Sequence, residues 1–303
     1  MARKSRGEPI EMPAAAKANH ILGYPLDARL LIVNADDFGA CFAQNLGTIR
    51  SIDEGLVRSC SLMSPAPWSL HAAHFLKENP RISCGVHLTL VSEYPPYRWG
   101  PLTPAQAVSS LVDESGYFRL DDGIPDLLLY GELAEIEREF RAQIEWTFAQ
   151  EVNVTHLDGH YHVHEEREDI FDLTVSLALE YGLALRVGKR THIDALQALG
   201  YPTNDHDVMD SGRTRPEDKP EVFTRLLREL PSGLSEWAFH PGIVSDELRA
   251  VMHEPVIPGV SATPEGRQSD FDFITSDEVG AIVKQEGIQV LDYAVLQPFW
   301  QRI

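Results

Sequence analysis

The chain is poor in cysteine and in positive charge, and these shortages exclude several classes of protein. It has only three cysteines in 303 residues, without a CxxC pair, so neither a disulfide framework nor a thiolate metal site is expected. We predict that Cys41, Cys60 and Cys84 are buried free thiols. Lys and Arg number 26 against 46 Asp and Glu, which gives a net charge of −20. This balance disfavours nucleic acid and anionic membranes as partners, because both attract clustered positive charge, and it suits a neutral substrate.

The sequence also lacks long apolar runs and several common catalytic motifs. No segment approaches the ~20 apolar residues of a membrane span. No apolar segment follows the basic residues Arg3, Lys4 and Arg6, as a secretory signal would require, so we expect a cytoplasmic enzyme. The motifs GxSxG, GxGxxG and GxxxxGK[ST] do not occur. A serine-hydrolase elbow, a dinucleotide site and a P-loop are therefore not predicted.

Segments typical of buried strands alternate with segments of helical periodicity from residue 30 to the end. Strands are expected within 30–39, 57–64, 82–90, 154–160, 183–188, 234–242 and 288–296, helices within 43–55, 70–80, 124–151, 169–182, 219–230 and 275–287, and loops at 92–125, 188–218 and 251–268. This alternation predicts an α/β fold with a largely parallel sheet. The number of strands favours a closed or nearly closed barrel over an open sheet.

The first 27 residues differ in composition from the rest. They are rich in Ala, Pro, Lys and Glu and have no strong period. We predict that 1–27 is an extension, partly disordered or draped over the surface. No linker divides the remainder, so 28–303 is predicted to form a single domain.

Polar residues follow several of the predicted strands directly. They are Asp36 and Asp37, His87, Asp158 and His160, Arg186, and His240. The carboxyl ends of parallel strands form the functional face of α/β folds. We therefore expect these side chains to meet at one face.

The stretch HLDGHYHVH, residues 156–164, is the most conspicuous of these segments. Strand alternation would point His160, His162 and His164 to one side and Tyr161 to the other. A solvated histidine patch is an alternative. The pair Asp36–Asp37 could likewise cap the following helix, but adjacent buried carboxylates are costly unless a cation compensates them.

An aspartate and two histidines form a ligand set that leaves positions open for water and substrate. Zinc suits such a set best; Mn, Co, Ni or Fe(II) could also bind, and magnesium is less natural with two histidines. A divalent metal lowers the pKa of a bound water and polarises a carbonyl. A second aspartate could then accept a proton and a remote histidine could protonate a leaving amine. Asp36, Asp37, His87, His160 and His240 supply these groups.

The segments NADDFG, GVHLTL, THLDGHYHVH, AFHPG and GIQVLDY together resemble the YdjC-like carbohydrate deacetylases, which include the chitooligosaccharide deacetylases. The resemblance runs from about Leu30 to about Leu296. It implies an irregular, TIM-like (β/α) barrel related to polysaccharide deacetylases. It also implies a cytoplasmic hydrolase, often a homodimer, that removes the N-acetyl group from an amino sugar or short oligosaccharide.

The resemblance also implies roles for individual residues. Asp37, His87 and His160 would hold the metal, and Asp36 would be the general base. By analogy with polysaccharide deacetylases, His240 would be the general acid or an oxyanion contact.

Four further residues, Asp158, His162, His164 and Arg186, are expected to support the site or to contact substrate. The role of His156 stays open.

The sequence departs from the family pattern at Gly159 and Tyr161, where a serine and a histidine are common. The loop SEYPPYRWGPL and the segment 188–218 look particular to this chain. Within the loop, Tyr94, Tyr97 and Trp99 could stack on a sugar or could pack within the loop. A hydrolase of another amide or ester on the same scaffold, or a non-catalytic carbohydrate- or metal-binding protein, are the alternatives to a deacetylase.

Overall fold

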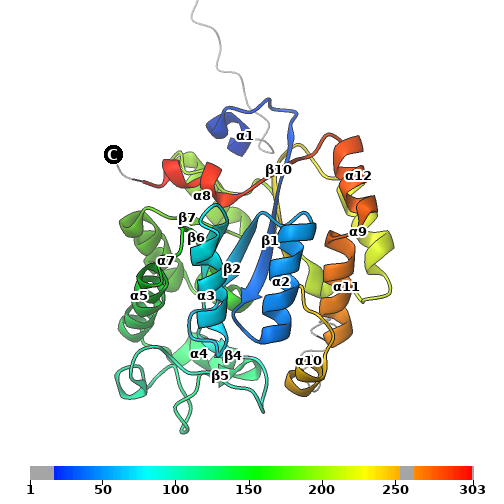
Figure 1. The fold of residues 1–303 in the computed structure, drawn as a ribbon. Coiled ribbons are helices and arrows are strands. Elements are labelled where there is room, and N and C mark those ends of the chain that lie inside the picture. The colour runs from blue at the N-terminus through cyan, green and yellow to red at the C-terminus, as the bar shows by residue number, and fades with distance from the viewer. Residues whose placement is uncertain (1–16, 253–262, 302–303) are drawn as a thin grey trace, which may run out of the picture.

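A parallel β-sheet forms the centre of the molecule, as a computed structural model covering residues 17–252 and 263–301 shows (Figure 1). Its strand order is β7-β6-β3-β2-β1-β9-β8, with β10 also paired to β1, and every pairing is parallel. The strands are β1 (Arg29–Phe38), β2 (Ser59–Leu62), β3 (Ser83–Leu88), β6 (Val154–Gly159), β7 (Ala184–Leu185), β8 (Met209–Asp210), β9 (Gly233–Phe239) and β10 (Gln289–Leu291). The predicted α/β fold with a parallel sheet is confirmed.

Strand β1 lies inside this sheet and pairs with three other strands. All of its residues except Arg29 are buried, as expected for a strand covered on both faces. Strand β9 pairs with 29–35 along one edge; along the other, β10 pairs with 30–32 and β2 with 34–38. Within the described residues no pairing joins β7 to β8, so the curled sheet is an irregular and incompletely closed barrel.

Helices surround the sheet (Figure 1). They are α1 (Lys17–Leu22), α2 (Phe42–Glu54), α3 (Ser69–Glu78), α4 (Ile124–Tyr130), α5 (Leu133–Ala149), α6 (Val163–Glu166), α7 (Glu168–Tyr181), α8 (Arg190–Ala198), α9 (Lys219–Arg228), α10 (Asp246–Val251), α11 (Pro264–Ile274) and α12 (Asp277–Gln285). A small sheet of β4 (Val91–Ser92) and β5 (Arg119–Leu120) lies with α4 beyond the carboxyl end of β1. None of the helices in the described ranges has the length and apolarity needed to cross a membrane.

Three expectations about elements need correction. The single helix expected within 124–151 is two helices, because the backbone turns out of the helical conformation at Gly131. The loop expected at 188–218 contains α8, β8 and a 3₁₀ turn at Ser211–Arg213. The loop expected at 251–268 includes the start of α11, which Thr263 caps through its side chain; its residues 253–262 lie outside the described residues.

Part of the predicted N-terminal extension is built into the fold. Residues 1–16 lie outside the described residues, but α1 buries Ala18 and Asn19 completely. The Asn19 side chain donates hydrogen bonds to two backbone carbonyls, and the Ala18 backbone N–H donates to Asp205 at 3.0 Å. The segment 17–22 is therefore a helix docked on the fold, while the division into an extension of 1–27 and a domain of 28–303 stays a prediction.

The three cysteines are buried and unpaired, as predicted. His156, whose role the sequence left open, is also a core residue. Its ring stacks on Tyr293 with centroids 3.6 Å apart, and burial lowers its pKa to about 3. It is therefore a neutral packing residue on β6, buried against Tyr293.

Gly85 makes room for this histidine. A Cβ at Gly85 would lie 2.4 Å from His156 Nε2, and the stack on Tyr293 prevents the ring from moving away. We expect Gly85→Ala to lower the free energy of unfolding by about 1–3 kcal/mol, as overpacked core sites do. The control is Gly280→Ala on α12, where a Cβ meets nothing within 4 Å and a gain of up to about 1 kcal/mol is expected. Urea unfolding of both variants measures the difference; equal stabilities would contradict the packing argument.

Candidate metal and catalytic site

The polar residues at the strand ends converge on one pocket with a volume of about 250 Å³. Of the residues predicted from sequence, the pocket is lined by Asp36, Asp37, His87, His160, His162 and His240. Asp158, His164 and Arg186 are buried behind this lining. The expectation of a shared functional face is thus met in space by residues at or just beyond the carboxyl ends of β1, β3, β6 and β9.

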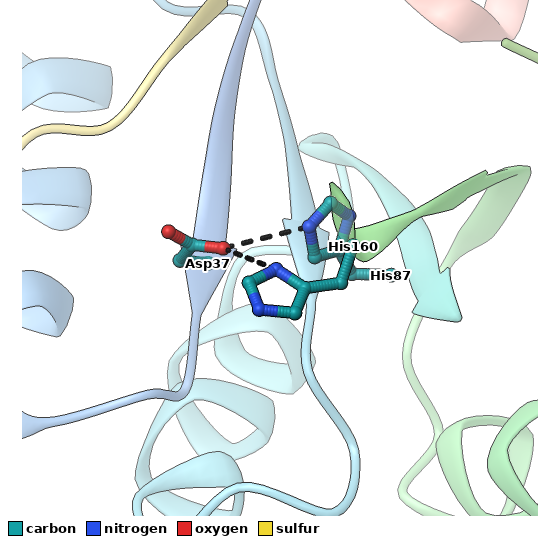
Figure 2. Close-up of side chains that lie close together, drawn as sticks. All are labelled: Asp37, His87 and His160. Carbon is teal, nitrogen blue, oxygen red and sulfur yellow. Dashed lines mark ion pairs between the residues drawn. The ribbon is translucent and has the colours of Figure 1, made fainter. Parts of the chain in front are cut away.

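Asp37, His87 and His160 form a compact cluster (Figure 2). Asp37 Oδ1 lies 3.5 Å from His87 Nε2 and 3.3 Å from His160 Nδ1, and it makes no hydrogen bond within the described part of the chain. These separations match the edges of a ligand shell, since ligands at about 2.1 Å from a tetrahedral metal lie roughly 3.4 Å apart. The cluster therefore fits a divalent metal.

The backbone of β1 brings two consecutive aspartates to the same pocket. In a regular strand adjacent side chains point to opposite faces. Here the pairing of β1 with β2 shifts register between Ala35 and Phe38, and Asp37 adopts φ = 61°, a conformation uncommon for a residue other than glycine. Backbone strain of this kind concentrates at functional sites.

Arg267 holds the second oxygen of Asp37. Its Nη2 is 2.8 Å from Asp37 Oδ2, and both side chains are buried. Burial alone would raise the pKa of Asp37, but Arg267 and the two histidines lower it well below its usual range. The sequence reasoning missed Arg267 because 251–268 was expected to be a loop.

His87 is oriented from behind by Asp158. His87 Nδ1 and Asp158 Oδ1 lie 2.9 Å apart, so Nε2 faces Asp37. Burial would lower the pKa of His87, but Asp158, with help from Asp37 and Asp36, raises it to about 10. Without a metal both nitrogens of this ring are protonated, and a metal that binds Nε2 must displace the proton there.

Arg186 is the buried counter-ion of three carboxylates. It binds both oxygens of Asp36 at 2.7 and 2.8 Å, and it lies 2.9 Å from Asp158 and 2.7 Å from Glu236. Burial raises the pKa values of Asp36 and Asp158, and Arg186 outweighs that effect and lowers both. Glu236, which also accepts a hydrogen bond from Tyr293 at 2.5 Å, was not recognised from the sequence, where it is one acid inside an apolar strand.

The histidine run does not continue as a strand. Strand β6 ends at Gly159, and residues 160–162 form a turn in which Tyr161 and His162 have φ of 53° and 55°. Tyr161 was expected to face away, but it lines the same pocket as His160 and His162, because the turn breaks the alternation. Burial and the neighbouring His164 lower the pKa of His162 to about 4. His164 points elsewhere, with Nε2 3.2 Å from the backbone oxygen of Arg186.

His240 lines the pocket and is partly exposed, with a quarter of its side chain accessible. Its Nδ1 is 3.2 Å from Ser211 Oγ, which donates to Asp270 at 2.5 Å; Asp270 also accepts from the His240 backbone N–H at 3.0 Å. Lys219 balances the charge of Asp270 at 2.5 Å. Ser211 and Asp270 were missed because the elements that carry them were expected to be loops or lay outside any motif.

The aromatic residues of the loop after β4 are packed within it. Trp99 is buried and donates its indole N–H to the Val91 carbonyl at 3.0 Å, and Tyr94 is buried beside Arg267. Tyr97 donates to the Ala40 carbonyl at 3.0 Å. None of the three lines the described pocket, so loop packing describes them better than sugar stacking.

Comparison with known proteins identifies the family. Residues 30–285 match the model of the YdjC-like proteins. The chain belongs to the YdjC-like family. A carbohydrate deacetylase of Thermoanaerobacter pseudethanolicus is 28% identical over 89% of this chain and all of its own length. A carbohydrate deacetylase of Brevibacillus brevis is 30% identical over 88% of this chain and 99% of its own.

A solved structure shares the architecture of this YdjC-like chain. It belongs to an Enterococcus faecalis protein described as a cellobiose-phosphate cleavage protein, with a TM-score of 0.72 and 25% identity. It covers 88% of this chain, and 98% of that protein is covered in return. The relatives therefore match along nearly their whole length.

Removal of Arg186 should destabilise the folded protein. Arg186→Met should lower the free energy of unfolding at pH 7 by about 3–5 kcal/mol, because it leaves buried carboxylates without a counter-charge. Arg141→Met is the control: it removes a partly exposed ion pair with Glu137 and Glu180, and a loss of at most about 1 kcal/mol is expected. Urea unfolding with chelator present measures both.

The loss of unfolding free energy in Arg186→Met should depend on pH. In the wild type the pKa values of Asp36 and Asp158 lie below the unfolded value of about 3.9. Their contribution is thus present above pH 4 and is lost as the pH falls further. In the variant the largest effect that opposes burial is lost and only weaker ones, chiefly from His87, are left, so these pKa values rise and protonation relieves the unpaired charge. The stability gap should narrow from pH 7 to pH 5; a gap independent of pH would count against this explanation.

Proposed function

We propose that this protein is a metal-dependent carbohydrate deacetylase that hydrolyses the N-acetyl group of an amino sugar or short oligosaccharide. The observation that carries the proposal is the convergence of Asp37, His87 and His160 on one pocket with Asp36 and His240. Two relatives that match this chain along nearly their full length are named carbohydrate deacetylases. The overall acidity of the chain suits a neutral sugar.

Asp37, His87 and His160 would hold the metal. One carboxylate and two imidazoles favour zinc, or another transition metal, over magnesium. The bound metal would supply an activated water and polarise the amide carbonyl. Asp158 would keep the His87 ring in the orientation in which Nε2 faces Asp37.

Asp36 is the proposed general base. It lines the pocket beside Asp37 but is not part of the cluster of Asp37, His87 and His160. Arg186 lowers its pKa against the effect of burial, so Asp36 is unprotonated near neutral pH and can accept a proton. The bidentate contact with Arg186 fixes the direction in which the carboxylate faces.

His240 is the proposed general acid. It lines the same pocket, and a quarter of its side chain is accessible, as contact with a leaving amine requires. Ser211 and Asp270 orient it. His240 would give its proton to the amine as the carbon–nitrogen bond breaks, while acetate remains as the other product. His162 and Tyr161, which line this wall, would contact the sugar. A cytoplasmic location and a homodimer remain predictions.

Acetate release tests the reaction directly. The zinc-loaded wild type should release acetate from at least one member of a panel of N-acetylated mono- and disaccharides. Chelator should abolish release and added zinc should restore it. Asp37→Ala, His87→Ala and His160→Ala should each lose metal and activity together, because each removes a proposed ligand. Acetate release that persists in metal-free protein would refute metal dependence, and release from none of the sugars would favour another amide or ester as substrate.

The role of Asp36 is separable from that of the ligands. Asp36→Asn should bind zinc with the wild-type affinity and lose turnover by roughly 10²–10⁴, the usual contribution of a positioned acid or base. Zinc titration and initial rates on the same preparation measure the two effects. Full turnover in Asp36→Asn would remove Asp36 from this role, whereas loss of zinc would move it into the ligand set.

A further inference from the structure

Glu93 lies beside the ligand cluster, although the proposed mechanism does not use it. It follows β4 directly, is largely buried and lines the pocket. Its Oε1 is 3.7 Å from His160 Nε2, and its Oε2 is 3.7 Å from Arg267 Nη2. Glu93 therefore lies between His160, one proposed metal ligand, and Arg267, which binds another proposed ligand, Asp37.

Several buried donors around Glu93 lack partners. Within the described ranges, His160 Nε2 and Arg267 Nε and Nη1 make no hydrogen bond. A buried polar group without a partner costs about 1–3 kcal/mol. The gaps of 3.7 Å are only slightly longer than the ~2.7–3.2 Å of a hydrogen bond. A movement of less than about 1 Å would bring Glu93 within bonding distance of the imidazole.

The other proposed histidine ligand already has such a partner. Asp158 accepts from His87 Nδ1 at 2.9 Å, while Nε2 of the same ring faces Asp37. His160 presents Nδ1 to Asp37, so Nε2 is its second nitrogen, and Glu93 is the carboxylate beside it. Histidines that ligate a metal regularly donate this second N–H to a carboxylate, which fixes the tautomer and the ring orientation.

We propose that Glu93 is the positioning residue of His160, accepting a hydrogen bond from Nε2 in the metal-loaded protein. Glu93 would bind His160, while Arg267, which lies beside Glu93, binds Asp37. The two residues together would connect these two proposed ligands. The inference rests on the proposed function, because it needs a metal at Asp37, His87 and His160.

Zinc affinity tests this role independently of turnover. Glu93→Gln keeps the size of the side chain and removes its charge, and zinc binding measured by competition with a chelator should weaken about 10- to 100-fold. The metal-free variant should unfold at the wild-type temperature, whereas the rise in Tm on adding zinc should be smaller. A residue with a merely structural role would lower the Tm of the metal-free protein instead.

Asp121→Asn is the matched control. Asp121 is another buried acid of the same loop region, 3.5 Å from the Tyr161 hydroxyl, and no ion pair to a proposed ligand is found for it in the described residues. Its substitution should leave zinc affinity unchanged. The proposed role of Glu93 is wrong if Glu93→Gln binds zinc with the wild-type affinity, or if Asp121→Asn loses as much zinc affinity as Glu93→Gln does. Neither result would contradict the metal site itself. Failure of the wild type to bind zinc, or tight binding by His160→Ala, would overturn the metal site and this inference together.

Discussion

One buried cation, Arg186, holds together the acidic residues of three strands at this site. Arg186 follows the short edge strand β7, yet it reaches Asp36 on β1, Asp158 on β6 and Glu236 on β9. Strands β6 and β7 thus meet β1 and β9, which lie several strands away in the sheet, at one guanidinium, and this is possible because the sheet curls. Burying several carboxylates together would be prohibitive without such a partner. The planar, five-donor guanidinium can serve several acids at once, whereas a lysine ammonium could not bind Asp36 through two parallel hydrogen bonds.

The two adjacent aspartates of β1 are distinguished by their surroundings. Arg186 takes both oxygens of Asp36, so that carboxylate is held by the protein alone. Arg267 takes one oxygen of Asp37 and leaves the other facing two imidazoles. Two chemically identical side chains therefore have different tasks available to them. In the proposed function Asp36 transfers a proton and Asp37 binds the metal.

Much of this arrangement was predictable from sequence, and the limits have physical causes. The buried strands and the polar residues at their ends place Asp36, Asp37, His87, His160 and His240 correctly, because parallel strands share one carboxyl face. Arg267, Asp270 and Ser211 could not be found in this way, since they lie on helices and turns whose sequences look like polar loops. The orientation of Tyr161 was predicted wrongly because a left-handed turn replaces the strand. The two residues with positive φ in this turn, Tyr161 and His162, are not glycines, so the sequence does not indicate the turn. Glu93 lies in a loop whose path depends on packing between distant segments.

The left-handed backbone at Asp37 means that backbone preference and side-chain contacts favour different residues at this position. Glycine would adopt φ = 61° without steric cost. It would, however, leave the buried guanidinium of Arg267 without its 2.8 Å carboxylate partner, and removing one member of a buried ion pair is costly. A glycine here would relieve backbone strain and leave a buried charge uncompensated, so backbone conformation alone is a poor guide to the stability of variants at Asp37.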